Sequence, residues 1–234
     1  MNFFIILLNR IIDVLKYPLA FVALLLTFEL FHVLYEVVEY IYVHLGFYED
    51  FFMGMVAYMV SWLLIFRNIT GKWFLVLEHE LTHILFALLT FHRIHELVAT
   101  NRGVGYVGFS GAGNGNWLIS IAPYFFPTFS MIVVFFIYLA QAQYYPVLII
   151  LLGYTFLYHI HSTIEETSYK QPDLKQVGLW FSWSFLPAAN LLAIIGILSA
   201  IPNDRIEFLR TLEHLYSYLM LLIADFLKVI IYFH

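Results

Sequence analysis

The sequence contains no cysteine and has a small share of charged residues. Asp, Glu, Lys and Arg make up 12% of its 234 residues, whereas soluble domains carry about 25%. The lack of cysteine excludes disulfides and thiolate metal ligands. The formal charge of −5 is spread without a basic run, so nothing indicates nucleic-acid binding. Because 62% of the residues are hydrophobic, the composition predicts an integral membrane protein.

The N-terminal segment also lacks the features of a cleaved signal peptide. Residues 1–10 have no basic stretch before their apolar run and no small-residue cleavage site. We expect the segment to be retained, either as an interfacial helix or as the first part of a span. Pro18 is expected to break or start a helix.

The apolar stretches predict an all-α polytopic membrane protein. At roughly 20 residues per span plus connections, the chain has room for six or seven transmembrane helices. We expect one integral membrane domain, 1–234, in the cell (inner) membrane. The predicted spans are residues 18–43, 47–66, 73–91, 117–140, 147–163, 176–201 and 208–233, with Pro123 and Pro127 bending the fourth.

One of these stretches, residues 73–91, carries an H-E-x-x-H pattern at His79-Glu80-Leu81-Thr82-His83. Residues four apart lie on the same face of a helix, so both imidazoles can reach one metal ion. Glu80 lies beside that face, where it can accept a proton from a water. The alternative interpretation is two buried histidines bonded to neighbouring carbonyls. Ionisable groups inside an apolar helix favour a functional site.

A catalytic zinc usually has three protein ligands, so a third must come from elsewhere in the chain. Asp173 is attractive because Gln171-Pro172 interrupts the helix, and its carboxylate then projects from an irregular turn before a new span. The downstream candidates are His159, His161, Glu165, Glu166 and Asp173.

A glycine-rich segment follows the H-E-x-x-H stretch. Residues 92–116 hold six of the chain's twelve glycines. Residues 97–99 and 106–109 are candidate short strands joined by a turn at 101–103, which predicts a β-hairpin-like insertion. Such a hairpin would lean over the metal site, since non-helical backbone near a membrane must be buried in protein or face water. A disordered surface loop is the alternative.

Together these features resemble the site-2 protease family of intramembrane zinc metallopeptidases. The shared elements are H-E-x-x-H in an apolar helix, a glycine-rich segment, another span with Ala122-Pro123, and Pro172-Asp173 before a later span. The resemblance covers about residues 73–200, which leaves 1–67 and 208–234 as flanking helices. It implies one Zn2+ per chain, held by the ligands His79, His83 and Asp173, with Glu80 as the catalytic residue.

The sequence departs from the family pattern around the third ligand. Leu174 stands where the family has a glycine, and Glu165 stands eight positions before Asp173, where many members have an asparagine that assists the site. Glu165 and His161 are therefore candidates for an extra ligand, a hydrogen-bond partner of a zinc-binding histidine, or a solvated helix end.

The resemblance implies hydrolysis of peptide bonds in or near transmembrane segments of membrane proteins. Zinc would lower the pKa of a water, and Glu80 would take its proton and pass it to the leaving amine. The partners expected are a membrane-protein or peptide substrate, which the hairpin would hold by strand addition, the lipid bilayer, and an oligomer or regulatory partner. No nucleic acid is expected.

Two alternatives belong to other functional classes. One is a non-proteolytic, metal-binding membrane scaffold or subunit that retains the protease-like fold. The other is a di-iron lipid oxidase, for which Glu29-Leu30-Phe31-His32 supplies an E-x-x-H but the usual histidine clusters are absent. Glu29 and His32 share one helix face with Glu36 and Glu39. We expect that face to point into the helix bundle, with its acids protonated or paired; a substrate or water path is the alternative.

Overall fold

The computed structural model describes residues 3–67, 71–100, 105–110 and 115–201, together with four isolated positions beyond residue 201. These residues are mostly helical. The expected span at 208–233 and the turn at 101–103 lie outside the described residues.

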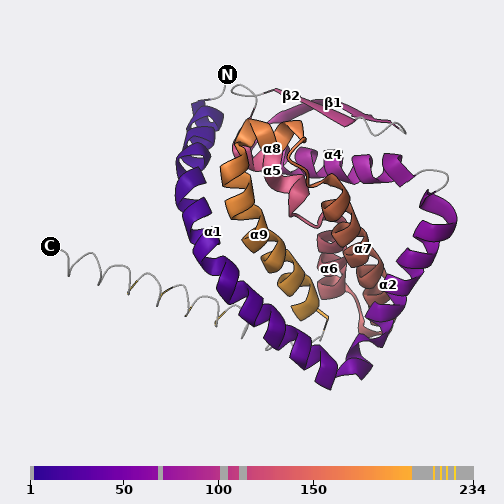
Figure 1. The fold of residues 1–234 in the computed structure, drawn as a ribbon. Helices are drawn as coiled ribbons and strands as arrows, with labels where there is room; N and C mark the ends of the chain where they lie inside the picture. The colour runs from indigo at the N-terminus through magenta and orange to yellow at the C-terminus, as the bar shows by residue number, and fades with distance from the viewer. Residues whose placement is uncertain are drawn as a thin grey trace.

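Long helices form the body of the molecule (Figure 1). α1 (Phe3–Val43) packs along α9 (Leu179–Ser199), and α2 (Glu49–Ser61) packs along α7 (Tyr145–Glu166). Short helical turns extend two of them: η1 (Leu45–Tyr48) precedes α2, the π-helix η2 (Trp62–Phe66) continues it, and η4 (Ala142–Tyr144) precedes α7.

Among the described residues, four helices are long and apolar enough to cross a membrane. α5 (Trp117–Ile121) with η3 (Ala122–Tyr124) and α6 (Thr128–Leu139) forms a fifth if this pair is one broken span. The pair is bent by 82°, at the place where Pro123 and Pro127 predict a bend. The described part therefore supplies four or five of the expected six or seven spans.

α1 differs from the expectation at its first proline. Pro18 was expected to break or start a helix, but α1 continues through it for 41 residues. A proline removes one backbone hydrogen bond and crowds one carbonyl. The long apolar helix on both sides, packed along α9, tolerates this local loss.

The face of α1 that carries His32, Glu36 and Glu39 was expected to point into the helix bundle, but it does not. His32 and Glu36 pair at 3.4 Å, with their side chains 64% and 61% exposed, and Glu39 is exposed as well. This face therefore points away from the described helix bundle instead of into it.

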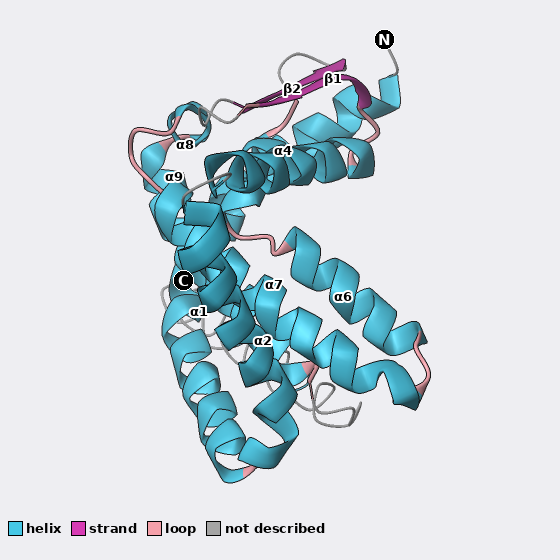
Figure 2. Ribbon diagram, turned by 90° about the vertical axis from the view of Figure 1, so that its right-hand side faces the viewer, coloured by secondary structure: helices cyan, strands magenta, loops and turns pink. Residues whose placement is uncertain are grey.

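The helix with the H-E-x-x-H pattern is α4 (Gly71–Leu89). It runs across one end of the bundle, at a steep angle to α7 (Figures 1 and 2). It was expected to be a span, but it is not among the candidate spans of the described residues. Its three consecutive ionisable residues, Glu78, His79 and Glu80, are nevertheless buried, because other elements pack around it.

Two antiparallel strands cover the outer side of α4 (Figure 2). β1 (Arg93–Ala99) pairs with β2 (Gly105–Ser110), so that Leu97 faces Val107, with a bulge between Ile94 and Glu96. The strands are longer than the predicted segments 97–99 and 106–109. Both contact α4.

α7 is held against α2 by close backbone approach at two glycines. A Cβ on Gly153 would lie 1.9 Å from the Phe51 carbonyl oxygen, and one on Gly54 would lie 1.9 Å from the Ile150 carbonyl oxygen. Small residues allow membrane helices to approach in this way. The contact fixes the position of α7, whose end reaches α4.

Candidate metal centre

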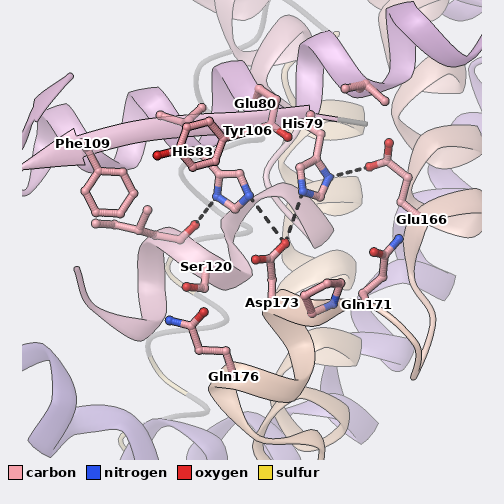
Figure 3. A pocket seen from close by; sticks show the side chains of 15 residues that line it. His79, Glu80, His83, Tyr106, Phe109, Ser120, Glu166, Gln171, Asp173 and Gln176 are labelled. Carbon is pink, nitrogen blue, oxygen red and sulfur yellow. Dashed lines mark hydrogen bonds and ion pairs between the residues drawn. The ribbon is translucent and has the colours of Figure 1, made fainter. Parts of the chain in front are cut away.

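The two histidines of α4 converge on one carboxylate (Figure 3). The Nε2 atoms of His79 and His83 lie 3.6 and 3.7 Å from Oδ2 of Asp173. Asp173 comes from α8 (Pro172–Val177), a short helix that begins with Pro172. One ligand atom from each of these three residues lies within 4.8 Å of the others, so the group can hold a metal ion.

The donor set and its spacing fit zinc. Two imidazole nitrogens and one carboxylate oxygen are common catalytic zinc ligands, and such sites keep a fourth position for water or substrate. With metal–ligand distances of about 2.0–2.1 Å, neighbouring ligands of a tetrahedral ion lie about 3.4 Å apart. The two observed separations, 3.6 and 3.7 Å, are close to that value.

The second nitrogen of each ring fixes which nitrogen faces the metal position. Nδ1 of His79 lies 2.7 Å from Oε2 of Glu166, and Nδ1 of His83 lies 2.8 Å from the carbonyl oxygen of Ile119. In the neutral rings, both acceptors require the proton to be on Nδ1, which leaves the Nε2 lone pairs free to bind a metal ion. Metal-binding histidines are typically oriented in this way.

Charge in the site is balanced between the histidines and the carboxylates. Burial alone would raise the pKa of Asp173, but the neighbouring His79 and His83 imidazoles hold it well below its usual range. Burial would lower the pKa of His79, but Asp173 and Glu166 raise it to about 10. Without a metal, His79 is therefore protonated at neutral pH. The Tyr124 hydroxyl also donates to Asp173, at 3.2 Å.

Glu80 is buried beside the histidines and lies under β2. A Cβ on Gly105 would fall 2.1 Å from Oε1 of Glu80 and 2.6 Å from Cγ1 of Val76, so only glycine allows this approach. Burial raises the pKa of Glu80, and the neighbouring histidines partly offset that rise. A carboxylate with a raised pKa is suited to accepting and releasing a proton.

These residues open onto a cavity of about 590 Å³. β2 forms one side of it through Tyr106 and Phe109, and Ser120, Gln171 and Gln176 lie on the other side (Figure 3). The wall therefore combines a strand with polar side chains around the metal position. Its size is in the range of ordinary ligand sites.

The other sequence-based candidates lie outside the three-residue group. His161 pairs through Nδ1 with the Tyr58 hydroxyl at 2.6 Å, and Glu165 is 63% exposed, 4.0 Å from His161. His159 is buried within α7. Glu166, considered as a third ligand, instead bonds Nδ1 of His79.

Sequence reasoning missed the Ile119 carbonyl and the Tyr124 hydroxyl. A backbone acceptor leaves no mark in the sequence. The Ala122-Pro123 pair was the only signal near Tyr124, and it lies in η3, the 3-10 helix that follows α5 and ends at Tyr124.

Comparison with known proteins gives a family match that covers part of the site. Residues 51–166 match the family model described as Peptidase M50B-like, a site-2 protease family domain. The matched residues include His79, Glu80, His83 and Glu166 but end before Asp173. No curated protein and no solved structure matches the chain significantly.

Proposed function

Since residues 51–166 match the model of a site-2 protease family domain, we propose that this chain is a zinc-dependent intramembrane peptidase. It hydrolyses peptide bonds in or near transmembrane segments of membrane proteins. The observation that carries the proposal is the convergence of His79, His83 and Asp173 beside the buried carboxylate of Glu80. The family and the membrane-compatible helices support a membrane metallopeptidase in general.

Each residue has a defined task in this mechanism. His79, His83 and Asp173 would hold one zinc ion, which acts as a Lewis acid toward water and the substrate carbonyl. The Glu80 carboxylate accepts a proton from the attacking water and delivers it to the leaving amine. Glu166 and Ile119 keep the two imidazoles in the required tautomer.

The substrate would bind in an extended conformation along β2. In the described sheet, β2 pairs with β1 only, and Gly105, Tyr106, Val107 and Phe109 line the cavity. An unfolded membrane segment that adds to this strand would satisfy its own backbone groups while crossing the metal position. We place the protein in the cell (inner) membrane, with its apolar helices in the bilayer.

The decisive test is Glu80→Gln in the full-length protein, purified in detergent and reconstituted in vesicles with a membrane-protein substrate. Zinc content should stay near one per chain, whereas cleavage should fall on the order of 10²–10⁴-fold, the usual contribution of a general base. Glu165→Gln, at an exposed acid of α7, is the matched control and should cleave normally. Undiminished cleavage by Glu80→Gln with full zinc would refute the mechanism. A wild-type protein that binds zinc but cleaves no substrate would favour the scaffold alternative.

A further inference from the structure

A buried amide of α1 connects the two elements that hold His83. Asn9 is 5% exposed. Its Nδ2 lies 3.3 Å from Nε2 of His92, three residues beyond the end of α4. Its Oδ1 accepts a hydrogen bond at 2.9 Å from Asn116, the residue that caps the beginning of α5. One side chain therefore contacts both ends of the segment that contains the hairpin.

Backbone donors and acceptors fix the direction of every bond in this network. Oδ1 of Asn116 accepts from the backbone N–H groups of Leu118 and Ile119, at 3.1 and 3.2 Å. Its Nδ2 must then donate to Asn9, and Nδ2 of Asn9 must donate to Nε2 of His92. A neutral His92 with its proton on Nδ1 satisfies this order.

The network ends on the last turn of α4. Nδ1 of His92 lies 3.0 Å from Oγ1 of Thr90, whose hydroxyl donates to the Phe86 carbonyl at 2.8 Å. Phe91, between Thr90 and His92, has φ of +63°, a left-handed conformation that non-glycine residues adopt rarely. Such a conformation persists where surrounding contacts determine it.

The position of α5 matters because Ile119 supplies the acceptor for His83. The hydrogen bond from Nδ1 of His83 to the Ile119 carbonyl, at 2.8 Å, spans from α4 to α5. The chain between α4 and α5 passes through β1 and β2, so no short connection holds the two helices together. Asn9 bridges them through His92, just beyond α4, and Asn116, the cap of α5. Trp117 adds a second link to α1 by donating to the Ile12 carbonyl.

We propose that Asn9 is a positioning residue for the metal site. It acts through Asn116 and α5 to hold the Ile119 carbonyl against His83, so that Nε2 of His83 faces the metal. The inference rests on the proposed zinc site. It also makes the N-terminal half of α1 part of the catalytic unit, although the sequence assigned this segment to a flanking helix.

Two variants of the full-length protein in detergent separate this role from general packing. Asn9→Ala removes the bridge. Asn116→Asp keeps a carboxylate oxygen to cap α5 but loses the donor to Asn9. The matched control is Thr155→Val, which removes a buried hydroxyl bonded to Ser130 between α6 and α7, away from His83.

The readouts are the zinc dissociation constant, measured by competition with a chromogenic chelator, and the visible absorption spectrum of the cobalt-substituted protein. Asn9→Ala and Asn116→Asp should each weaken zinc binding by about tenfold, the lower end of the effect of losing the outer partner of a ligand, because both act on His83 through Ile119. Both should shift the cobalt bands. Thr155→Val should lower the melting temperature at most, with wild-type affinity and spectrum.

Wild-type zinc affinity and an unchanged cobalt spectrum in Asn116→Asp would overturn the inference, as would an equal loss of affinity in Thr155→Val. If Asn9→Ala does not fold, Asn116→Asp decides the question, because it retains the helix cap. A wild-type protein that binds no zinc would instead refute the proposed metal site. Variants that bind zinc with normal affinity would refute only the role of Asn9.

Discussion

At the scale of single residues, the two metal-site histidines are held by unlike acceptors. His79 donates to the carboxylate of Glu166, which carries charge, whereas His83 donates to the neutral carbonyl of Ile119. A carboxylate partner makes an imidazole a stronger base and a stronger metal ligand. The two ligands should therefore respond differently when their partners are changed.

Replacing Glu166 with glutamine should weaken zinc binding about 10–100-fold, because the amide still accepts a hydrogen bond but no longer supplies charge to His79. The same chelator competition measures the change. Glu165→Gln, one position away and exposed, should retain wild-type affinity. Equal affinities for the two variants would show that Glu166 does not support His79.

The residue scale also shows how far the sequence could predict this site. Helix periodicity alone placed His79 and His83 on one face, and the structure has them there. Asp173 was proposed from the break at Pro172 and from the family resemblance; the family match covers residues 51–166 and ends before Asp173. Glu165 and Glu166 differ by about 100° around a helix, so only the packing of α7 decides which one reaches His79.

At the scale of elements, backbone contacts between helices decide what the sequence left open. The expected break at Pro18 was wrong because packing along α9 supports a continuous α1. α4 was expected to be a span, yet it crosses the end of the bundle, with buried ionisable residues that neighbouring elements cover. Hydropathy predicts which segments avoid water, but the angle between helices depends on side chains far apart in the chain.

Gly153→Ala should destabilise the protein by about 1–3 kcal/mol or more, since its Cβ would overlap the Phe51 carbonyl and push α7 away from α2. Thermal unfolding in detergent, followed by circular dichroism, measures the effect. Gly196→Ala in α9 is the control, because its Cβ has no neighbour within 4 Å; it should be neutral or stabilising by up to about 1 kcal/mol. A melting temperature for Gly153→Ala at or above that of wild type would contradict the close α2–α7 contact.

At the scale of the whole molecule, the metal site joins segments that are distant in sequence. His83 and Asp173 are 90 positions apart (173 − 83 = 90), and α5 contacts both α4 and α8. Large apolar side chains such as Phe28 on α1 and Trp180 on α9 are exposed, as expected for helices that face lipid. The composition predicted this membrane class, whereas the crossing of α4 under the hairpin required the structure.

Removing zinc should lower the melting temperature of the whole protein, and the loss should grow with pH. A ligand that binds only the folded state stabilises it in proportion to the logarithm of its affinity. In the metal-free protein Asp173 and Glu166 raise the pKa of His79 to about 10, against the effect of burial, so zinc must displace a proton. Below that pKa, each pH unit of increase should tighten zinc binding up to about tenfold, or about 1.4 kcal/mol.

The measurement compares melting temperatures with zinc and with excess chelator at pH 6 and pH 7.5, at one free zinc concentration. The difference in melting temperature between the zinc-bound and the chelated protein should be larger at pH 7.5 than at pH 6, because fewer protons compete for His79. Asp173→Asn serves as the control, since it removes the charged oxygen that faces both Nε2 atoms, and its zinc-dependent difference should be small at both pH values. A difference that stays constant with pH in the wild type would mean that zinc does not bind through His79.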